Sequence, residues 1–323
     1  MQRALTGMQP SGDVHLGNYL GMVEPALALQ ERYATFYFIA DYHALTTVKE
    51  PEKLRQSSRQ AAATFLALGL DVEGAATLYR QSAVPEVCEL AWLLACVTSA
   101  GTLERGHAVK AARDGGLDIS AGTVFYPILM AADILLYDSN VVPVGRDQKQ
   151  HVEIARDLAV KLNHHFGEGT LTVPEVQIRP DVGLVPGTDG RKMSKSYGNT
   201  IPLWSTKKQL RKSMMRIVTD SLGLDDPKDP DTCNVFALYK LFATEDQQAD
   251  LAGRYRAGGL GYGHAKQELF EVVEGRLAQP RKAYQEWMAH PERIEEVLDA
   301  GATKARAAAT VVLDRVRHAV GLT

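Results

Sequence analysis

Ala34-Thr-Phe-Tyr-Phe-Ile-Ala40 is an apolar, aromatic run of strand length, and it decides the expected fold. A helical pattern follows it at 51–70, and a second strand-like run, Ala76-Thr-Leu-Tyr79, comes next. Strand, helix and strand in this order predict two parallel strands joined by a crossover helix. We therefore expect a doubly wound α/β sheet, in which ligands bind beyond the carboxyl ends of the strands.

The same alternation extends outward over the first 200 residues. Ala4 and Leu5 begin a strand, and Asn140-Val-Val-Pro-Val-Gly145 is a third short β-branched run. Helical stretches are expected between the strands, at 85–98 and 148–166. The loop from Gly183 to Asn199, rich in glycine and charge, is expected to be mobile and to join this region to the next.

After about residue 200 the strand signals stop. Helices are expected at 209–218, 234–243, 265–277 and 280–288. A last helix carries an apolar stripe at helical spacing: Ala305, Ala309, Val312, Val316 and Val320. Arg306, Thr310 and Arg317 lie off that stripe, as a solvated face or as contacts to RNA backbone. We expect an α/β region at 1–200 and an all-helical region at 201–323.

Composition limits the class of protein. The chain has 323 residues, 45% hydrophobic and 23% charged, with a net charge of −3, which is typical of a globular protein of about two domains. Cys88, Cys96 and Cys233 contain no CxxC pair and cannot supply four thiolates for a structural zinc or an iron–sulfur cluster. Neither a signal-peptide core nor an apolar run of about 20 residues is present, which favours the cytoplasm.

The first motif is Gly7-Met-Gln-Pro-Ser-Gly-Asp-Val-His-Leu-Gly-Asn-Tyr19. A strand runs into a Gly/Pro turn, and His15-Leu-Gly-Asn18 then opens a helix, whose N–H groups and dipole suit phosphate. Gly17 lets a nucleotide approach the backbone, and His15 and Asn18 can donate to phosphate or ribose oxygens. Without other signals, a strand–helix turn with no function is an equally good interpretation.

The second motif is Lys192-Met-Ser-Lys-Ser196, in the glycine-rich loop. Two lysines flank two hydroxyl groups there. ATP chemistry that expels pyrophosphate needs positive charge where the leaving group gains negative charge, and a mobile loop can supply it in the transition state. A merely solvated basic loop is the alternative.

Together these motifs resemble the HIGH and KMSKS signatures of class I aminoacyl-tRNA synthetases. The segments GMQPSGDVHLGNYLG, FIADYHALT, YPILMAADILLYD and PVGRDQKQHVE look like blocks of the bacterial tryptophanyl-tRNA synthetases, in the same order. The resemblance implies a Rossmann catalytic domain, a helical anticodon-binding domain at 201–323 and a homodimer. It also implies tRNA(Trp), L-tryptophan and ATP as partners, with Mg²⁺ carried on the phosphates.

A third motif concerns the amino acid. Tyr126, Met130 and Asp133 share one face of a helix. Related tyrosyl enzymes typically carry Gln where this chain has Met130, and both polar groups there meet the phenol. An indole has one N–H, which the Asp133 carboxylate can accept, and a large apolar body that suits Met130, Val142 and Val144. A core aspartate that caps a helix or forms an ion pair is the alternative.

The resemblance implies further roles. Tyr126 and Gln148 would hold the ammonium group of tryptophan, with Gln9 or His43 near its carboxylate, although His43 could equally be a core histidine. Leu5 and Gly7 complete the expected tryptophan site. The expected catalytic residues are His15, Asn18, Lys192 and Lys195. The expected ATP site comprises Gln9, Pro10, Ser11, Gly17, Asn18, Gly145, Arg146, Asp147, Leu184, Lys192, Met193, Ser194, Lys195 and Ser196.

Two positions depart from the family pattern. Many relatives carry an acidic residue at Arg146, so a backbone contact to the nucleotide is the safer expectation there. Many also have a lysine-rich stretch after Glu104-Arg105, for which Lys110 and Arg113 are the candidates here. Three rival functions stay open: a tyrosyl enzyme, a small-molecule nucleotidyltransferase, and a non-catalytic paralogue that binds RNA or tryptophan.

Overall fold

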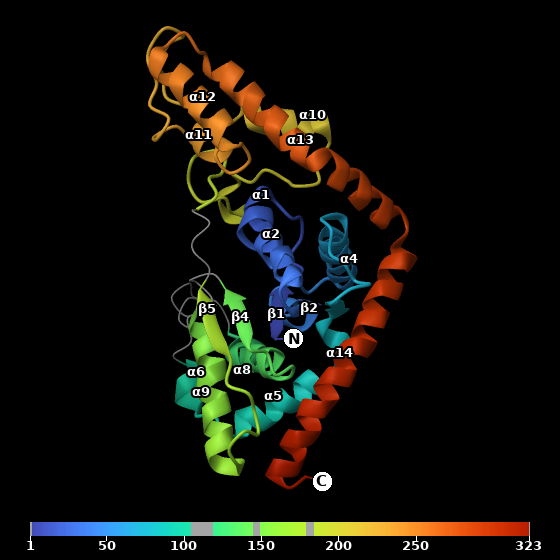
Figure 1. The fold of residues 1–323 in the computed structure, drawn as a ribbon. Coiled ribbons are helices and arrows are strands. Elements are labelled where there is room, and N and C mark those ends of the chain that lie inside the picture. Colours follow the sequence, from blue (N-terminus) through green and yellow to red (C-terminus); the bar gives the residue numbers. More distant parts are fainter. Residues whose placement is uncertain (1, 105–118, 145–148, 179–183, 323) are drawn as a thin grey trace. The chain divides into compact units, whose positions relative to one another are not determined.

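The computed structural model describes residues 2–104, 119–144, 149–178 and 184–322 (Figure 1). Two compact units emerge from the contacts within the chain. Unit 1 comprises Met1–Gly12, Ala26–Pro180 and His290–Thr323, and unit 2 comprises Asp13–Pro25 and Asp181–Ala289.

Unit 1 is built on a five-stranded sheet of order β3-β2-β1-β4-β5. Its strands are β1 (Arg3–Met8), β2 (Ala34–Ile39), β3 (Ala76–Arg80), β4 (Val141–Val144) and β5 (Glu175–Ile178). All four neighbouring pairs are parallel, and strand order reverses between β1 and β4. The expected doubly wound α/β sheet is confirmed, with β5 as an unexpected outer strand.

Helices cover both faces of this sheet. The helices of unit 1 are α3 (Asp41–Ala44), α4 (Pro51–Ala67), α5 (Glu86–Cys96), α6 (Ala100–Glu104), α8 (Ala121–Leu135), α9 (Lys149–Phe166) and α14 (Pro291–Val320). On one face Tyr37 of β2 packs against Phe65 of α4, with 5.5 Å between ring centroids. On the other, Phe36 stacks on Tyr137, which follows α8, at 4.6 Å.

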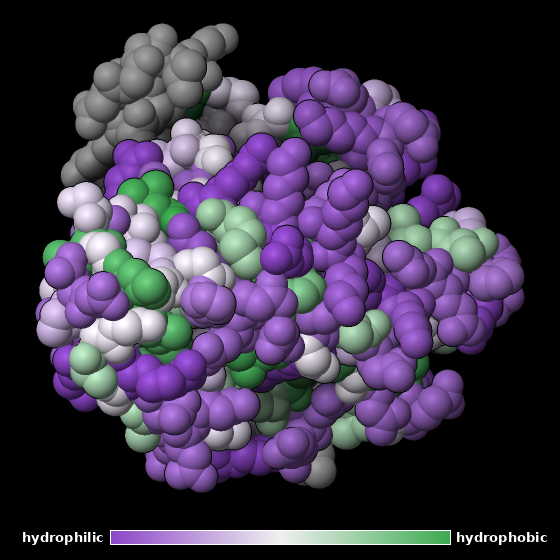
Figure 2. Space-filling view, turned by 90° about the horizontal axis from the view of Figure 1, so that it is seen from above, coloured by the Kyte–Doolittle hydropathy of each residue, from purple (hydrophilic) through white to green (hydrophobic). Residues whose placement is uncertain are grey.

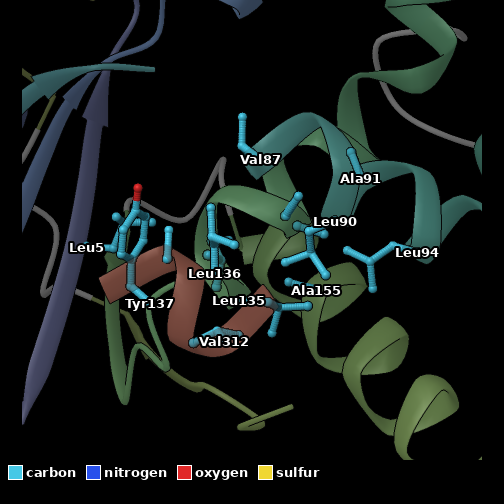
Figure 3. Close-up of a cluster of buried hydrophobic side chains, with 14 of the residues drawn as sticks. Leu5, Val87, Leu90, Ala91, Leu94, Leu135, Leu136, Tyr137, Ala155 and Val312 are labelled. Atoms are coloured by element: carbon cyan, nitrogen blue, oxygen red, sulfur yellow. The ribbon is translucent and has the colours of Figure 1, made fainter. Parts of the chain in front are cut away.

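The largest core cluster lies on this second face. Figure 3 shows Leu5 of β1 beside Tyr137, with side chains of α5, α8, α9 and α14 packed around them. Leu90 and Leu135 are fully buried in it. Because successive side chains of a strand alternate between faces, Leu5 and Gly7 point toward this layer together.

Helix α14 packs on unit 1 although the sequence pattern placed it in the helical region. Its expected apolar stripe is confirmed, since Ala305, Ala309, Val312 and Val316 are buried in the core. Gly301 lies against the backbone of β3, and a Cβ built there would be 1.8 Å from the carbonyl oxygen of Leu78. The helix thereby covers the outer strand of the sheet, whose edge would otherwise be open for pairing.

The arginines of α14 belong to this packing. Arg306 donates to Glu86 of α5 at 2.9 Å, and Arg317 forms two hydrogen bonds with Glu89 of α5, at 2.7 and 2.6 Å. Arg306 and Thr310 are exposed, as expected of a solvated face, while Arg317 is half-buried and both guanidinium groups pair with carboxylates of α5. The alternative of an RNA contact stays a prediction.

Unit 2 is helical apart from loops. It contains α1 (Leu16–Asn18), α10 (Lys207–Met215), α11 (Asn234–Tyr239), α12 (Glu245–Ala257) and α13 (Tyr262–Ala289), and α2 (Glu24–Leu27) crosses its boundary. The two helices expected at 265–277 and 280–288 are one continuous helix, α13, with Pro280 inside it. A proline removes one hydrogen bond of a helix and crowds one carbonyl, and the helix-forming residues on both sides carry α13 through.

The compact units are not colinear with the boundary expected at residue 200. Residues 13–25, which carry the first signature, and the loop after residue 181 belong to unit 2. Residues 290–323 belong to unit 1, because the apolar stripe of α14 is buried against the sheet. The functional division into a catalytic region at 1–200 and an anticodon-binding region at 201–323 stays a prediction.

One face of the molecule is mainly polar. Figure 2 shows a face dominated by hydrophilic residues, with hydrophobic ones in small separate patches. None of the helices in the described ranges has the length and apolarity that crossing a membrane requires.

Candidate active site

The carboxyl ends of β2 and β3 are joined by a buried carboxylate. Asp41 follows β2, and its Oδ1 accepts hydrogen bonds from the backbone N–H groups of Tyr42 at 3.0 Å and Ser82 at 2.9 Å. The Ser82 hydroxyl donates to the other carboxylate oxygen. This clamp fixes the two loops that carry His43 and Gln81, at the edge of the sheet where ligands of such folds bind.

Gln81 links two of the expected tryptophan-binding residues. Its Nε2 donates to Oδ2 of Asp133 at 2.8 Å and to Nδ1 of His43, also at 2.8 Å. Its Oε1 accepts from the backbone N–H of His43 at 3.4 Å. All three side chains are at most 3% exposed. One buried amide thus orients both a carboxylate and an imidazole.

Burial sets the charges of this cluster. It raises the pKa of Asp133 well above its ordinary value; the Gln81 hydrogen bond opposes the rise and the negative charge of Asp41 adds to it. Burial lowers the pKa of His43 to about 4, so at neutral pH its 3.8 Å approach to Asp133 is not an ion pair. Nδ1 of His43 lies 2.8 Å from Nε2 and 3.2 Å from Oε1 of Gln81; we assign the hydrogen bond to the shorter contact, in which Nδ1 accepts, and this assignment puts the proton on Nε2 of His43. That nitrogen is buried, with no hydrogen-bond partner among the described residues.

Helix α8 supplies one wall beside this cluster. Tyr126 meets the His43 ring edge-on at 4.3 Å, and Asp133 lies two turns further along the helix. Met130 lies between them, half-buried and packed against the core. Ser120 caps the helix by accepting from the Thr123 N–H at 3.2 Å, and Pro127 falls inside it.

Of the remaining residues of the expected tryptophan site, three are described on β1 and β4, and the side chains of the other two lie outside the described part of the chain. Leu5 and Val142 are 2% and 3% exposed, in the core cluster that also includes Met130 as a half-buried neighbour. Gly7 has a packing reason to be glycine, because a Cβ there would be 2.3 Å from the ring of Phe38. Val144 ends β4, but its side chain lies outside the described part of the chain, as does Gln148.

Part of the expected ATP site follows β1 at the reversal of strand order. Gln9, Pro10 and Ser11 continue from β1, and the Ser11 N–H donates to the carbonyl of Gln9 at 2.9 Å to close a tight turn. Such a reversal creates a crevice for nucleotides in doubly wound sheets. The other expected contacts from unit 1, Gly145, Arg146 and Asp147, lie outside the described residues, as do Lys110 and Arg113.

In unit 2 the first signature forms a reciprocal helix cap. Nδ1 of His15 accepts from the backbone N–H of Asn18 at 3.3 Å, and Oδ1 of Asn18 accepts from the backbone N–H of His15 at 3.2 Å. Burial, followed by the positive charge of Lys195, lowers the pKa of His15 to about 4. The imidazole is therefore neutral at neutral pH, with Nε2 as its donor.

The second signature packs directly on the first. The backbone N–H of Gly17 donates to Sδ of Met193 at 3.2 Å, and a Cβ on Gly17 would lie 3.3 Å from Cβ of Met193. The neighbouring backbone adds two hydrogen bonds, from Leu16 to Ile201 at 3.0 Å and from Leu203 to Val14 at 2.9 Å. Met193 is the buried member of the pentapeptide, while Lys192, Lys195 and Ser196 are exposed.

Asn199 organises the loop that carries the lysines. Its Oδ1 accepts from the Ser194 N–H at 2.8 Å, and its Nδ2 donates to Oδ1 of Asp189 at 2.6 Å and to the carbonyl of Lys192 at 3.1 Å. It is 2% exposed. The described part of the loop expected to be mobile, 184–199, is thus hydrogen-bonded around one amide.

The surroundings of Lys195 change its pKa. Burial lowers the pKa of Lys195, and the carboxylate of Asp13 opposes that change. Leu184, expected at the ATP site, is 72% exposed. Through the contacts between Gly17 and Met193, the structure brings His15, Gly17, Asn18 and the Lys192–Ser196 loop together within unit 2.

Three side chains in these sites were not identified from the sequence: Gln81, Asp41 and Asn199. Gln81 and Asp41 each carry a usable signal, because a polar residue stands within two positions of the end of a strand at the ligand-binding edge of the sheet. Asn199 has no such signal, since two of its three partners are backbone groups set by the loop conformation.

Comparison with known proteins agrees with this arrangement. A family model described as tRNA synthetases class I (W and Y) matches residues 1–278. The chain is 49% identical over 320 residues to a tryptophan–tRNA ligase of Campylobacter jejuni strain RM1221, covering 99% of this chain and 100% of that protein. A tryptophan–tRNA ligase of Rhodopirellula baltica is 50% identical over 321 residues, with 99% of each chain covered.

Solved structures give the same result. The crystal structure of the Campylobacter jejuni tryptophanyl-tRNA synthetase complexed with ADP and tryptophan superposes with a TM-score of 0.93 at 48% identity, covering 99% of this chain and 100% of that one. The Mycoplasma pneumoniae enzyme gives a TM-score of 0.82 at 32% identity, covering 100% and 98%. This chain therefore belongs to the class I tRNA synthetases for tryptophan and tyrosine, and among them to the tryptophan–tRNA ligases.

Proposed function

We propose that this chain activates L-tryptophan with ATP and transfers it to tRNA(Trp). The observation that carries the choice of amino acid is the buried carboxylate of Asp133, one oxygen of which accepts from Gln81 at 2.8 Å. No described residue forms a hydrogen bond with the other oxygen, which can accept the single N–H of an indole.

The surroundings of Asp133 favour indole over phenol. A phenol hydroxyl both donates and accepts, and the Met130 thioether beside Asp133 satisfies neither need well. The large apolar body of an indole suits Met130, Leu5 and Val142. A tyrosyl enzyme is therefore the weaker alternative.

Polar groups around the amino-acid backbone of the substrate complete the site. Tyr126 and Gln148 are proposed to hold the ammonium group. The buried Nε2–H of His43 is suited to the carboxylate, with Gln9 as the other candidate, because the Gln81 hydrogen bond leaves this nitrogen as a donor.

Chemistry begins with attack of the tryptophan carboxylate on the α-phosphorus of ATP. The new P–O bond forms as the bond to the β-phosphate oxygen breaks, giving tryptophanyl-adenylate and pyrophosphate. Neutral His15 donates from Nε2, with Asn18 and Gly17 beside it, and Lys192 and Lys195 stabilise the charge gained by the leaving group. A ribose hydroxyl of the terminal adenosine then attacks the carbonyl carbon, and AMP leaves.

The binding partners follow from this reaction. Mg²⁺ would enter with ATP, carried on its phosphates. Within the described ranges, His, Cys, Asp and Glu form no group of three or more that could hold a metal ion. We further propose a homodimer that works in the cytoplasm, as the family resemblance implies.

The test is ATP–pyrophosphate exchange with each of the twenty amino acids, without tRNA. Exchange with tryptophan alone supports adenylate formation and the assignment of Asp133. Exchange with tyrosine instead would keep the family and refute the pocket argument. Absence of exchange with every amino acid would refute the activation chemistry and favour the non-catalytic paralogue. Exchange with a carboxylic acid that is not an amino acid, tested in the same assay, would favour a small-molecule nucleotidyltransferase.

A further inference from the structure

Helix α10 (Lys207–Met215) concentrates positive charge. It carries Lys207, Lys208, Arg211 and Lys212, and Arg216 follows directly, with no acidic residue between 206 and 219. All five cationic side chains are exposed. We call these five residues the α10 basic surface.

Packing fixes which side of the helix these charges occupy. Leu210 and Met214 are fully buried, and α10 packs against α13 (Tyr262–Ala289). The apolar pair is one turn apart on a single stripe, and at helical spacing the cations lie off that stripe, over about half of the circumference. Thr206 and Gln209 form a reciprocal cap that fixes where the helix starts.

The α10 basic surface is not neutralised within the protein. Arg211 donates to the neutral Gln267 at 2.9 Å. Throughout the described chain, no carboxylate forms an ion pair with any of the five residues. Other arginines of unit 2 behave differently, since Arg254 pairs with Glu268 and Arg281 with Glu274.

This charge pattern opposes the stability of α10. Lys207 and Lys208 occupy the first turn, where the helix dipole favours negative groups. Lys207 and Arg211 are four residues apart, as are Lys208 and Lys212, and like charges at that spacing repel. A helix selected only to fold would not carry this pattern, which indicates an external polyanion.

We propose that the α10 basic surface binds the phosphate backbone of the tRNA substrate. The inference rests on the proposed function, which makes tRNA the polyanion that this protein must bind. The net charge of the whole chain is −3, so a local basic surface is needed to attract RNA. Arg306 and Arg317 of α14, the other candidates, pair with carboxylates of α5. The Lys192–Ser196 loop belongs to the same unit as α10.

The test compares two triple variants with equal change of charge. Lys207→Gln/Lys208→Gln/Lys212→Gln removes three charges from the α10 basic surface. The control, Lys53→Gln/Lys161→Gln/Lys304→Gln, removes three from exposed helix positions of unit 1. For each protein, tRNA(Trp) binding is measured over a series of salt concentrations, with aminoacylation and tryptophan-dependent ATP–pyrophosphate exchange.

The α10 variant is expected to raise the KM for tRNA about tenfold, with ATP–pyrophosphate exchange unchanged. The slope of log association constant for tRNA against log salt concentration should decrease in magnitude by about 2–3, because up to three phosphate contacts are lost. The control variant should match the wild type. Wild-type binding and slope in the α10 variant would overturn the proposal, as would an equal loss in the control. Direct tRNA binding can be measured without catalysis. A wild type that binds tRNA but shows no ATP–pyrophosphate exchange would refute the proposed function, and the binding comparison would still test the α10 basic surface.

Discussion

Replacing Gln81 with methionine tests the buried hydrogen-bond cluster most sharply. The change keeps length and volume and removes two donated hydrogen bonds of 2.8 Å, to Asp133 and to His43. A hydrogen bond to a charged group contributes about 1.5–3 kcal/mol, which corresponds to about 10–150-fold in binding. We therefore expect the KM for tryptophan to rise by that factor.

Other kinetic constants should change little in this variant. Gln81 contacts neither signature motif, so kcat at saturating tryptophan and the KM for ATP should stay near the wild-type values in ATP–pyrophosphate exchange. Gln30→Met is the matched control, because the half-buried Gln30 also makes two hydrogen bonds, to the carbonyl of Gly69 at 3.2 Å and from the N–H of Asp71 at 2.9 Å. A KM for tryptophan raised equally by both variants, or by neither, would refute the reasoning.

Three further predictions concern other parts of the chain. Lys195→Ala should slow adenylate formation by about 10²–10³-fold while tryptophan binding changes little, and equal losses in both would contradict a role at the leaving group. Burial raises the pKa of Asp133, and an indole N–H favours the ionised form of this carboxyl group. Tryptophan should therefore bind more tightly as pH rises through that pKa, and binding should release protons. Calorimetry in buffers of different ionisation enthalpy measures the protons exchanged, and proton uptake on binding would contradict the prediction. Gly301→Ala should destabilise the protein by about 1–3 kcal/mol, although alanine is the better helix former, because its Cβ would meet the Leu78 carbonyl at 1.8 Å. Gly275→Ala in α13, with nothing within 4 Å of its Cβ, should stabilise by up to about 1 kcal/mol in urea unfolding, and the same sign in both variants would be the contrary result.

The sheet could be predicted because its strands are buried on both faces. Ala34–Ala40 and Ala76–Tyr79 read as short apolar runs between helical patterns, and β2 and β3 form at those positions. Strand β5 (Glu175–Ile178) lies at the edge and has only four residues, so its hydrophobic pattern is too short to separate from a loop.

The extent of each unit could not be predicted from local patterns. The apolar stripe of α14 indicated a buried helix but not its partner, and the strand against which it packs, β3, lies more than 200 residues earlier in the chain. Likewise, the pairing of Leu16 with Ile201 joins segments far apart in sequence. Such contacts depend on tertiary packing, which periodicity does not encode.

The candidate site was predictable where chemistry requires a particular residue type. Asp133 and His43 were identified from their sequence blocks, and the structure brings them together through Gln81. Gln81 itself was missed, although it directly follows a strand that ends at the ligand-binding edge, because a single amide forms no motif. Asn199 was missed for the same reason, since it binds mainly backbone groups.

The central claim is that the Asp133 carboxylate recognises the indole N–H of tryptophan. Its most direct test is the ratio of kcat/KM for tryptophan to that for β-(3-benzothienyl)alanine, which replaces the N–H with sulfur, in ATP–pyrophosphate exchange. The wild type should prefer tryptophan by about 10–150-fold, because the analogue leaves a buried acceptor unpaired. In Asp133→Ala the preference should fall to near one. A wild type that uses both substrates equally would contradict the account.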